Sequence, residues 1–230
     1  KLASQVRAVE WIETGGELGA LLLESRLVKD LAPASNRRLR KSPGVYCLRL
    51  VATEGALRPV VEPLEASDLE SGTEAYGPFR TERDAWRAFE GKAREAGLCL
   101  KVAGRETGGG SCFAYQLGRC RGACVGKEPL LLHDARVRLA LASLRLRAWP
   151  FSGPVGIRER ANDGPGTLLH VIDRWQHLGT ARDESEVTEV LRAGTERPFD
   201  PDGYRIVAKC LERLPPRDLV PLARTERDAS

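Results

Sequence analysis

Four of the six cysteines in this chain lie within residues 99–124, and this stretch constrains the chain more than any other. They follow one another at separations of 13, 8 and 4 residues: Cys99, Cys112, Cys120 and Cys124. Four thiols so close in sequence indicate disulfides or a four-ligand metal site. The chain shows no apolar signal segment, so we expect a reducing, cytoplasmic compartment, which favours the metal.

The spacing leaves the nature of this metal open. Tetrahedral zinc sites usually combine two tight pairs of cysteines. Here only Cys120 and Cys124 form a tight pair, and the wide gaps suit an iron–sulfur cluster at least as well. A third interpretation is that the four cysteines are small packing residues without metal.

The positive charge of the chain is concentrated in and behind the cysteines. The net charge is +4, and residues 99–149 carry nine basic and three acidic side chains. Such a patch predicts a polyanion-binding surface, although a solvated basic helix would give the same count. No run of residues approaches the roughly 18 apolar residues of a membrane span, so we expect no membrane partner.

Periodicity and capping signals predict an α+β protein. Before the cysteines we expect strands at 6–13, 44–51 and 57–64 and helices at 17–29 and 81–96, with a turn at Gly77–Pro78. A basic amphipathic helix is predicted over 130–147, with Arg136, Arg138, Arg145 and Arg147 on its positive face. We also expect Phe113 and Tyr115 to cover the metal, and His133 to lie at the surface or at a helix cap.

The last part of the chain predicts a small α+β unit with no catalytic constellation. Strands are expected at 154–160, 166–175 and 177–181, and helices at 184–192 and 201–214.

Glu24 is unusual within the expected helix at 17–29. Its neighbours three and four positions away are all apolar, and a carboxylate among them is costly unless it is compensated. The simpler alternative is a side chain that leans into water. Asn36 follows twelve residues later, beside a basic run that could lie along a phosphate backbone: Arg37, Arg38, Arg40 and Lys41.

The run VEWIETGGELGALLLESRLVKDLAPASNRRLR resembles the second half of a GIY-YIG nuclease domain, as found in the UvrC excinucleases. The resemblance implies that Glu24 binds a catalytic Mg²⁺ or Mn²⁺ ion and that Asn36 supports this site. It also places the GIY strand, the YIG strand and the helix with a catalytic arginine before residue 1. The chain lacks Met, so Lys1 is not expected to be the natural start.

The segment CFAYQLGRCRGACVG is similar to the PCLxYQIxRCxxPCVG segment of the same family. The resemblance implies a 4Fe–4S cluster on the four cysteines, with zinc as the alternative. From the residues themselves we expect Arg119 and Arg121 to reach phosphate. Residues 151–230 resemble the C-terminal region of Cho-type homologues, some of which are fused behind a DNA polymerase III epsilon-like exonuclease.

These expectations divide the chain into three domains. Residues 1–41 form the second half of a nuclease domain, residues 42–150 a four-cysteine domain with helices, and residues 151–230 a small α+β unit. The resemblance implies a DNA-repair endonuclease of nucleotide excision repair and the SOS response. It would hydrolyse phosphodiester bonds in damaged double-stranded DNA beside a UvrB-like complex, and this chain alone would be inactive. The alternative is a non-catalytic DNA-binding or docking module.

Overall fold

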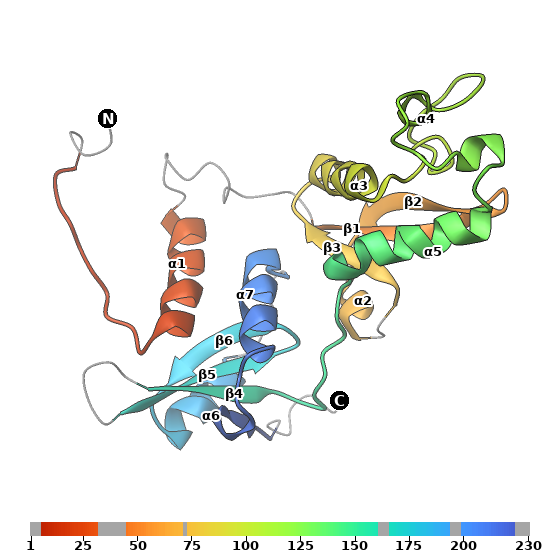
Figure 1. Cartoon of the computed structure of the whole chain (residues 1–230). Coiled ribbons are helices and arrows are strands. Elements are labelled where there is room, and N and C mark those ends of the chain that lie inside the picture. Colours follow the sequence, from red (N-terminus) through yellow and green to blue (C-terminus); the bar gives the residue numbers. More distant parts are fainter. Residues whose placement is uncertain (1–5, 32–44, 71–72, 161–165, 194–198, 224–230) are drawn as a thin grey trace. The chain divides into compact units, whose positions relative to one another are not determined.

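The computed structural model describes residues 6–31, 45–70, 73–160, 166–193 and 199–223 (Figure 1). It is a mixed α+β protein with two antiparallel sheets. The chain divides into two compact units. One comprises residues 41–150, and the other joins residues 1–40 to residues 151–230. None of the described helices is both long and apolar enough to cross a membrane.

The sheet of the 41–150 unit has the order β2-β1-β3. A tight hairpin at Glu54–Gly55, where both residues have positive φ, joins β1 (Tyr46–Thr53) to β2 (Ala56–Pro63). The two strands predicted here are confirmed, and β2 is an edge strand, as its prolines indicated. The predicted turn at Gly77–Pro78 is wrong, because this pair lies inside β3 (Ala75–Phe79). The short helix α2 (Ala66–Glu70) precedes β3.

Two long helices complete the core of this unit. Thr81 accepts a hydrogen bond from Asp84 N at the start of α3 (Glu82–Ala96), and Gly97 ends the helix in the left-handed conformation, as predicted. Helix α5 (Leu130–Leu141) packs against α3 and β2. Buried side chains from the sheet and both helices form one core: Leu48, Tyr76, Phe89, Val137 and Leu141.

The predicted helix 130–147 is too long. It ends at Leu141, and a 3₁₀ turn (Ala142–Leu144) follows. Beyond this turn the backbone bonds elsewhere, because Leu146 N donates to Ala75 O and Trp149 N donates to Leu69 O. Contacts distant in sequence therefore end the helix where local periodicity would continue it.

Residues 98–128, which we call the cysteine lobe, consist mostly of turns. Helix α4 (Phe113–Gln116) and a 3₁₀ turn (Ala123–Val125) are the regular elements of the lobe. The cysteine lobe follows α3 directly and leads into α5.

The second unit is built on a sheet of order β6-β5-β4-β7. Its strands are antiparallel: β4 (Val155–Arg160), β5 (Thr167–Asp173), β6 (Gln176–Ala181) and β7 (Leu219–Pro221). Helix α6 (Glu184–Arg192) packs on β5 and β6, and α7 (Pro201–Leu211) also contacts β6. A 3₁₀ turn (Pro216–Asp218) precedes β7. The three strands and two helices predicted for residues 151–230 are confirmed, with α7 ending at Leu211.

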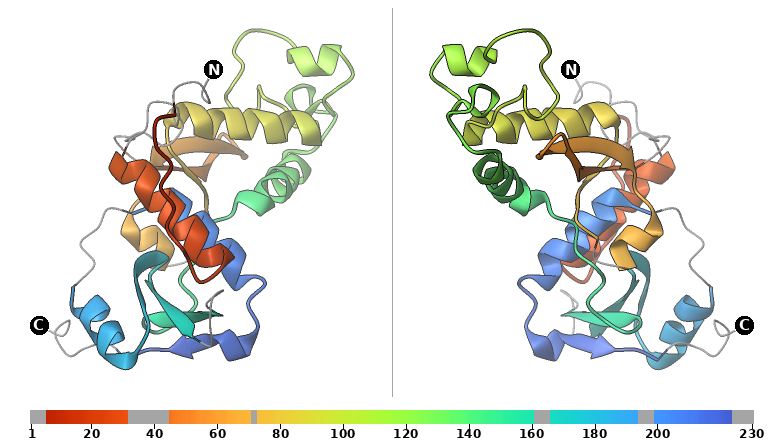
Figure 2. Two further views of the ribbon diagram at one scale, coloured as in Figure 1. Left: turned by 90° about the vertical axis from the view of Figure 1, so that its left-hand side faces the viewer. Right: turned by 90° about the vertical axis from the view of Figure 1, so that its right-hand side faces the viewer.

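Helix α1 (Glu17–Leu31) belongs to this same unit, where it runs beside α7 (Figures 1 and 2). Its buried face comprises Leu18, Gly19, Leu22, Ser25 and Val28. The expected first and third domains thus share one compact unit. The strand expected at 6–13 is wrong, since residues 6–13 have no regular structure. Among the described residues no sheet edge pairs with this segment, and Trp11 is 85% exposed.

Candidate metal centre and nucleic-acid interface

The structure brings the four cysteines of the lobe together. The sulfur atoms of Cys99, Cys112 and Cys124 all lie within 4.8 Å of one another. Cys120 packs in the same buried cluster, but its sulfur is not one of these three mutually close atoms. All four are free thiols, and no disulfide joins them. Sulfurs at positions 25 residues apart in sequence therefore converge on one point, as a shared metal centre requires.

The surroundings of these sulfurs fit a bound metal. Cys112 N donates to Cys124 Sγ over 3.3 Å, and Gly122 N donates to Cys120 Sγ over 3.4 Å. Burial raises the pKa of the Cys112 thiol, and the adjacent Cys120 and Cys99 thiols raise it further. A bound cation would stabilise the thiolate that this environment otherwise disfavours. The chemistry of four sulfur donors suits iron–sulfur or zinc.

Tyr115 packs against the cysteines, whereas Phe113 does not. Tyr115 belongs to the partly buried shell of the cluster, and the Lys127 ammonium lies 5.3 Å from its ring centroid. Phe113 is 64% exposed, so the prediction that it covers the metal is wrong. The reason is local: the two residues lie on different sides of the single turn of α4, and only one side faces the sulfurs.

His133, on α5, makes a hydrogen bond to the backbone of the cysteine lobe. It is fully buried in α5, and its Nε2 accepts a hydrogen bond of 3.1 Å from Cys99 N. Burial lowers the pKa of His133, which keeps the ring neutral and able to accept. The prediction of a surface or capping histidine is therefore wrong. Its spacing of 34 residues from Cys99 carries no sequence signal for this contact.

Replacing His133 with leucine is expected to destabilise the 41–150 unit by about 1–3 kcal/mol, because it leaves the buried Cys99 N–H without an acceptor. The loss is measured as the change in the free energy of unfolding in urea, with the hydrogen exchange of the α3 and α5 amides as the probe. His133→Gln should recover part of the stability, since its amide oxygen can accept the same hydrogen. Equal losses in the two variants would contradict the role assigned to Nε2.

The predicted DNA-contacting arginines of the lobe are exposed. Arg119 and Arg121 lie at the surface on either side of Cys120, and no described carboxylate pairs with either of them. Because Cys120 is held among the other sulfurs, the backbone that carries both guanidinium groups is fixed in place. The remaining predicted DNA contacts, Arg37, Arg38, Arg40 and Lys41, lie outside the described residues.

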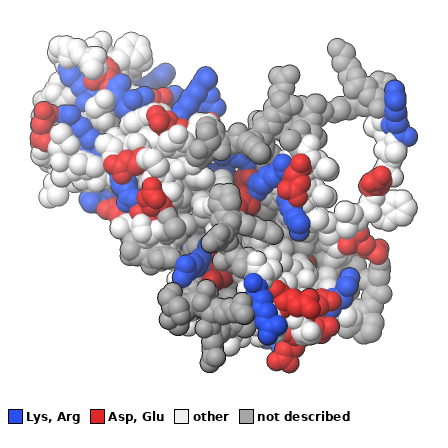
Figure 3. All heavy atoms as spheres, turned by 180° about the vertical axis from the view of Figure 1, so that it is seen from behind, with Lys and Arg blue, Asp and Glu red and all other residues white. Residues whose placement is uncertain are grey.

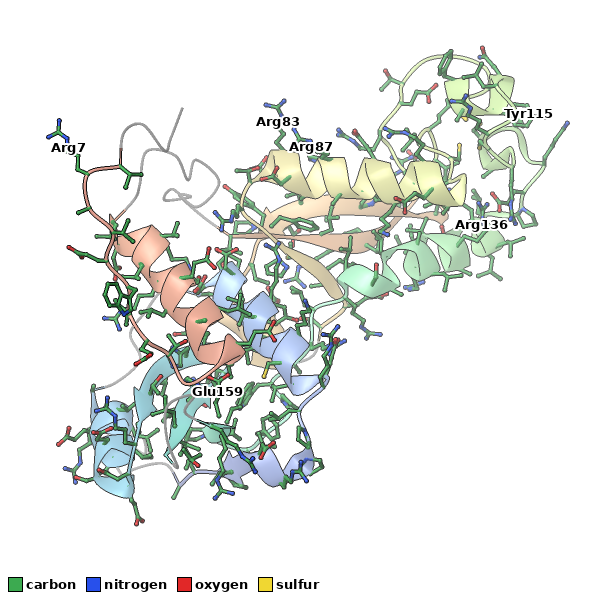
Figure 4. The ribbon with its side chains drawn as sticks, turned by 60° about the vertical axis from the view of Figure 1, so that its left-hand side comes forward. Arg7, Arg83, Arg87, Tyr115, Arg136 and Glu159 are labelled. Atoms are coloured by element: carbon green, nitrogen blue, oxygen red, sulfur yellow. The ribbon has the colours of Figure 1, made fainter. Side chains whose placement is uncertain are left out.

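The basic face predicted for the helix after the lobe is partly neutralised. Arg136 pairs with the buried Glu128 and donates to Ala96 O and Gly97 O at the end of α3 (Figure 4). Arg138 pairs with Glu74 over 2.9 Å. On the face of the molecule in Figure 3, basic side chains alternate with acidic ones rather than forming one continuous patch. The charge of residues 99–149 therefore does not all serve one surface.

Glu24 lies on the face of α1 away from the buried one. Its side chain is exposed, and no hydrogen bond or ion pair joins it to a described residue. Leu21 and Leu31, which are 39% and 71% exposed, lie on the same outer face of the helix. This helix face therefore combines exposed leucines with two exposed carboxylates, Glu17 and Glu24, in the described part of the chain. Asn36 lies outside the described residues.

Comparison with known proteins relates both units to one group of enzymes. Residues 47–143 match the UvrC/Cho excinuclease middle domain, and residues 154–226 match the excinuclease Cho C-terminal domain. The chain is 37% identical over 209 residues to excinuclease cho of Escherichia coli K12, covering 90% of this chain and 68% of that protein. The chain belongs to the Cho family of excinucleases.

Another Cho protein matches with similar identity and coverage, and UvrC proteins match over a shorter span. Excinuclease cho of Salmonella typhi is 35% identical over 211 residues, covering 90% of this chain and 69% of that protein. UvrABC system protein C of Symbiobacterium thermophilum is 32% identical over 126 residues, covering 54% of this chain and 19% of that protein. No solved structure matches the chain. The UvrC/Cho middle domain contains the whole cysteine lobe, whereas α1 lies outside both matched domains.

Proposed function

We propose that this Cho-family chain is the DNA-holding part of a repair endonuclease, which incises damaged double-stranded DNA by metal-dependent phosphodiester hydrolysis. The observation that carries this proposal is the outer face of α1, where, among the described residues, the exposed Glu24 lies beside the exposed Leu21 and Leu31. Such a face suits the packing of another part of a nuclease domain, which would enclose the carboxylate. Glu24 would then become the partly buried ligand that a divalent ion requires.

Within such a domain, Glu24 would hold one Mg²⁺ or Mn²⁺ ion, and Asn36 would brace that site. A carboxylate is the side chain that these hard cations prefer. The ion, when bound, offsets the charge that develops on the phosphate and on the leaving oxygen. The residues that activate the attacking water belong, by the GIY-YIG resemblance, to a segment that precedes α1. We therefore expect very low nuclease activity from this chain alone.

The four cysteines would hold a 4Fe–4S cluster in this protein, and zinc is the alternative metal. Their convergence and the backbone N–H···S bonds support a metal. Its role here is to fix the fold of the cysteine lobe, and so to place Arg119 and Arg121 against the DNA backbone. A UvrB-like protein bound to damaged DNA in the cytoplasm would be the partner complex.

Arg119 and Arg121 give the first test of DNA binding. If each contacts one phosphate, the double variant with alanine at both positions should reduce the slope of log K against log salt by about 2. Fluorescence anisotropy with a duplex between about 50 and 200 mM salt measures the slope. The matched control is alanine at Arg83 and Arg87, two exposed arginines of α3 (Figure 4). An equal change in both double variants would indicate only a loss of net charge.

A non-catalytic DNA-binding module is the second candidate. It is favoured by one observation: the four cysteines and the exposed Arg119 and Arg121 all lie within the 41–150 unit, which contains no part of α1. Incision assays on a damaged duplex separate the two functions. The nuclease requires Mg²⁺ or Mn²⁺ and Glu24 once the upstream half is supplied. For the non-catalytic module, neither the divalent ion nor Glu24 should matter, and its affinity for DNA should be the same without them.

A further inference from the structure

Helix α1 begins without a capping side chain of its own. Gly16 occupies the N-cap position, since its carbonyl accepts the first intrahelical bond, from Ala20 N over 3.0 Å. The N–H groups that follow an N-cap normally bond to the side chain of that residue, and glycine has none. Two of these N–H groups, on Leu18 and Gly19, are buried in the unit. They need an acceptor from elsewhere in the chain.

Glu159 of β4 supplies both missing acceptors. Its Oε1 accepts from Leu18 N over 2.8 Å, and its Oε2 accepts from Gly19 N over 2.9 Å. Figure 4 shows Glu159 at the start of α1. The carboxylate also lies at the positive end of the helix dipole, where a negative charge is stabilising. The cap of α1 thus comes from a residue that lies 141 positions further along the chain.

The glycines at the start of α1 make room for this carboxylate. A Cβ at Gly16 would lie 2.6 Å from Glu159 Oε1, and a Cβ at Gly19 would lie 3.0 Å from Oε2. The first distance is closer than non-bonded atoms approach, so a side chain at Gly16 would displace the carboxylate, whereas one at Gly19 would only crowd it. Neither glycine needs a left-handed backbone, since neither has a positive φ. The glycines of GGELG therefore leave space for the Glu159 carboxylate and are not required by a left-handed turn.

A buried histidine holds Glu159 in its orientation. His170 Nε2 lies 2.9 Å from Glu159 Oε2, and His170 Nδ1 lies 2.9 Å from Thr180 Oγ1. A carboxylate only accepts, so Nε2 donates to Glu159 and Nδ1 accepts from the Thr180 hydroxyl. The His177 Nε2 atom lies 3.3 Å from the same hydroxyl. The sheet β4-β5-β6 thereby orients the carboxylate through a continuous hydrogen-bond chain.

The other end of α1 is tied to the same unit. Lys29 Nζ pairs with Asp200 Oδ2 over 2.5 Å and also bonds to Ser25 Oγ over 2.8 Å. Asp200 itself caps α7, where its side chain accepts from Asp202 N. Helix α1 is therefore fixed at its first turn by β4 and near its last turn by α7. The face that carries Glu24 stays free between the two attachments.

We propose that Glu159 is a positioning residue of the nuclease: the Cho C-terminal domain caps α1 from outside and so sets the position of Glu24. Six residues of rigid helix, about 9 Å, separate the capped Leu18 N–H from Glu24. A small displacement at the first turn is carried along the helix to the carboxylate that holds the ion. The proposal rests on the proposed function, in which Glu24 is the metal ligand.

Glu159→Gln tests the proposal in the nuclease that carries its upstream half. Glutamine keeps the size but presents an NH₂ group where one of the two amides needs an acceptor. We expect kcat for incision to fall roughly 10- to 100-fold, with the KM for DNA unchanged, because the metal ligand is misplaced and DNA binding is not. Amide exchange at Leu18 and Gly19 should become about tenfold faster in the 230-residue chain.

Asp183→Asn is the matched control, since Asp183 caps α6 in the same unit with a bond of 2.9 Å to Glu186 N. It should leave kcat unchanged. Should Glu159→Gln fold poorly, Gly16→Ala displaces the carboxylate without removing it. Equal kcat for Glu159→Gln and Asp183→Asn, with Glu24→Ala inactive, would overturn the positioning role. Retained incision by Glu24→Ala would instead overturn the proposed function.

Discussion

Replacing Cys112 with serine is expected to abolish the metal binding that we propose for the four cysteines, and with it the order of the cysteine lobe. The Cys112 thiol lies within 4.8 Å of the Cys99 and Cys124 sulfurs, and Cys120 packs in the same buried cluster. Metal binding to such thiolate sites contributes on the order of 10 kcal/mol to folding in small domains. A hydroxyl does not replace a thiolate ligand for a soft metal.

The structure limits where the damage should occur. Around the sulfurs, the buried cluster consists of Cys99, Cys112, Cys120 and Ala123, with few apolar side chains packed against it. Without metal, this lobe has too little apolar area to remain folded. The core that includes Leu48, Phe89 and Val137 contains none of the four cysteines, although Leu98 and Ala103 at the start of the lobe belong to it. Loss of hydrogen-exchange protection should therefore be greatest in residues 98–128.

Anaerobic purification, metal analysis and a visible spectrum measure this expectation. Wild-type protein should be brown and contain iron, and Cys112→Ser should be colourless. The control is Cys210→Ser, in α7 of the other unit, which should keep full metal content. If the wild-type protein is colourless and contains zinc, the metal of the site is zinc and not an iron–sulfur cluster. Wild-type protein with neither metal would overturn the metal site.

Replacing Glu24 with alanine is expected to lower incision by at least about 100-fold in the nuclease that carries its upstream half. Stabilisation of the phosphate charge by a divalent ion contributes several kcal/mol to a transition state, and each 1.4 kcal/mol is tenfold in rate. Because Glu24 is exposed and makes no hydrogen bond or ion pair with a described residue, its removal should leave the free energy of unfolding almost unchanged. Loss of activity would then not be a loss of fold.

The rate of nicking of a damaged duplex, titrated with Mg²⁺ and Mn²⁺, measures this effect. Asp30→Asn is the matched control, since Asp30 is an exposed carboxylate of the same helix that pairs only loosely with Arg26 at 3.5 Å. It should keep wild-type incision. If both variants nick DNA at the wild-type rate, Glu24 is not a metal ligand, and the result favours the non-catalytic DNA-binding module.

Much of the fold followed from local signals in the sequence. Helix α3 begins at Thr81 and ends at Gly97 because cap residues act within one turn of the helix. The same is true of α6, whose predicted bounds agree with the structure. The strands β1, β2, β4, β5 and β6 were predicted from alternation and turn residues. These signals concern neighbours in sequence and do not depend on the rest of the molecule.

Other expectations failed where distant contacts decide the structure. Residues 6–13 have the alternation of a strand, but the described sheets give them no partner. The pair Gly77–Pro78 has turn chemistry, but it lies inside β3 as an irregularity, where the register with β1 shifts between Tyr76 and Phe79. His133 appeared as a surface residue because nothing in the sequence links it to Cys99. Phe113 and Tyr115 could not be told apart without the direction of α4.

The sequence alone determined the candidate chemistry of this protein. Cysteine is the side chain for a soft metal, and the spacing of four thiols in one stretch indicated their common site. Only the tertiary structure decided how α1 is held. Gly16 offers no cap, and the acceptor comes from Glu159 on a strand far along the chain. A hydrogen bond depends on the distance between atoms, and that distance is set by the folding of the β4 sheet against α1 rather than by residue order.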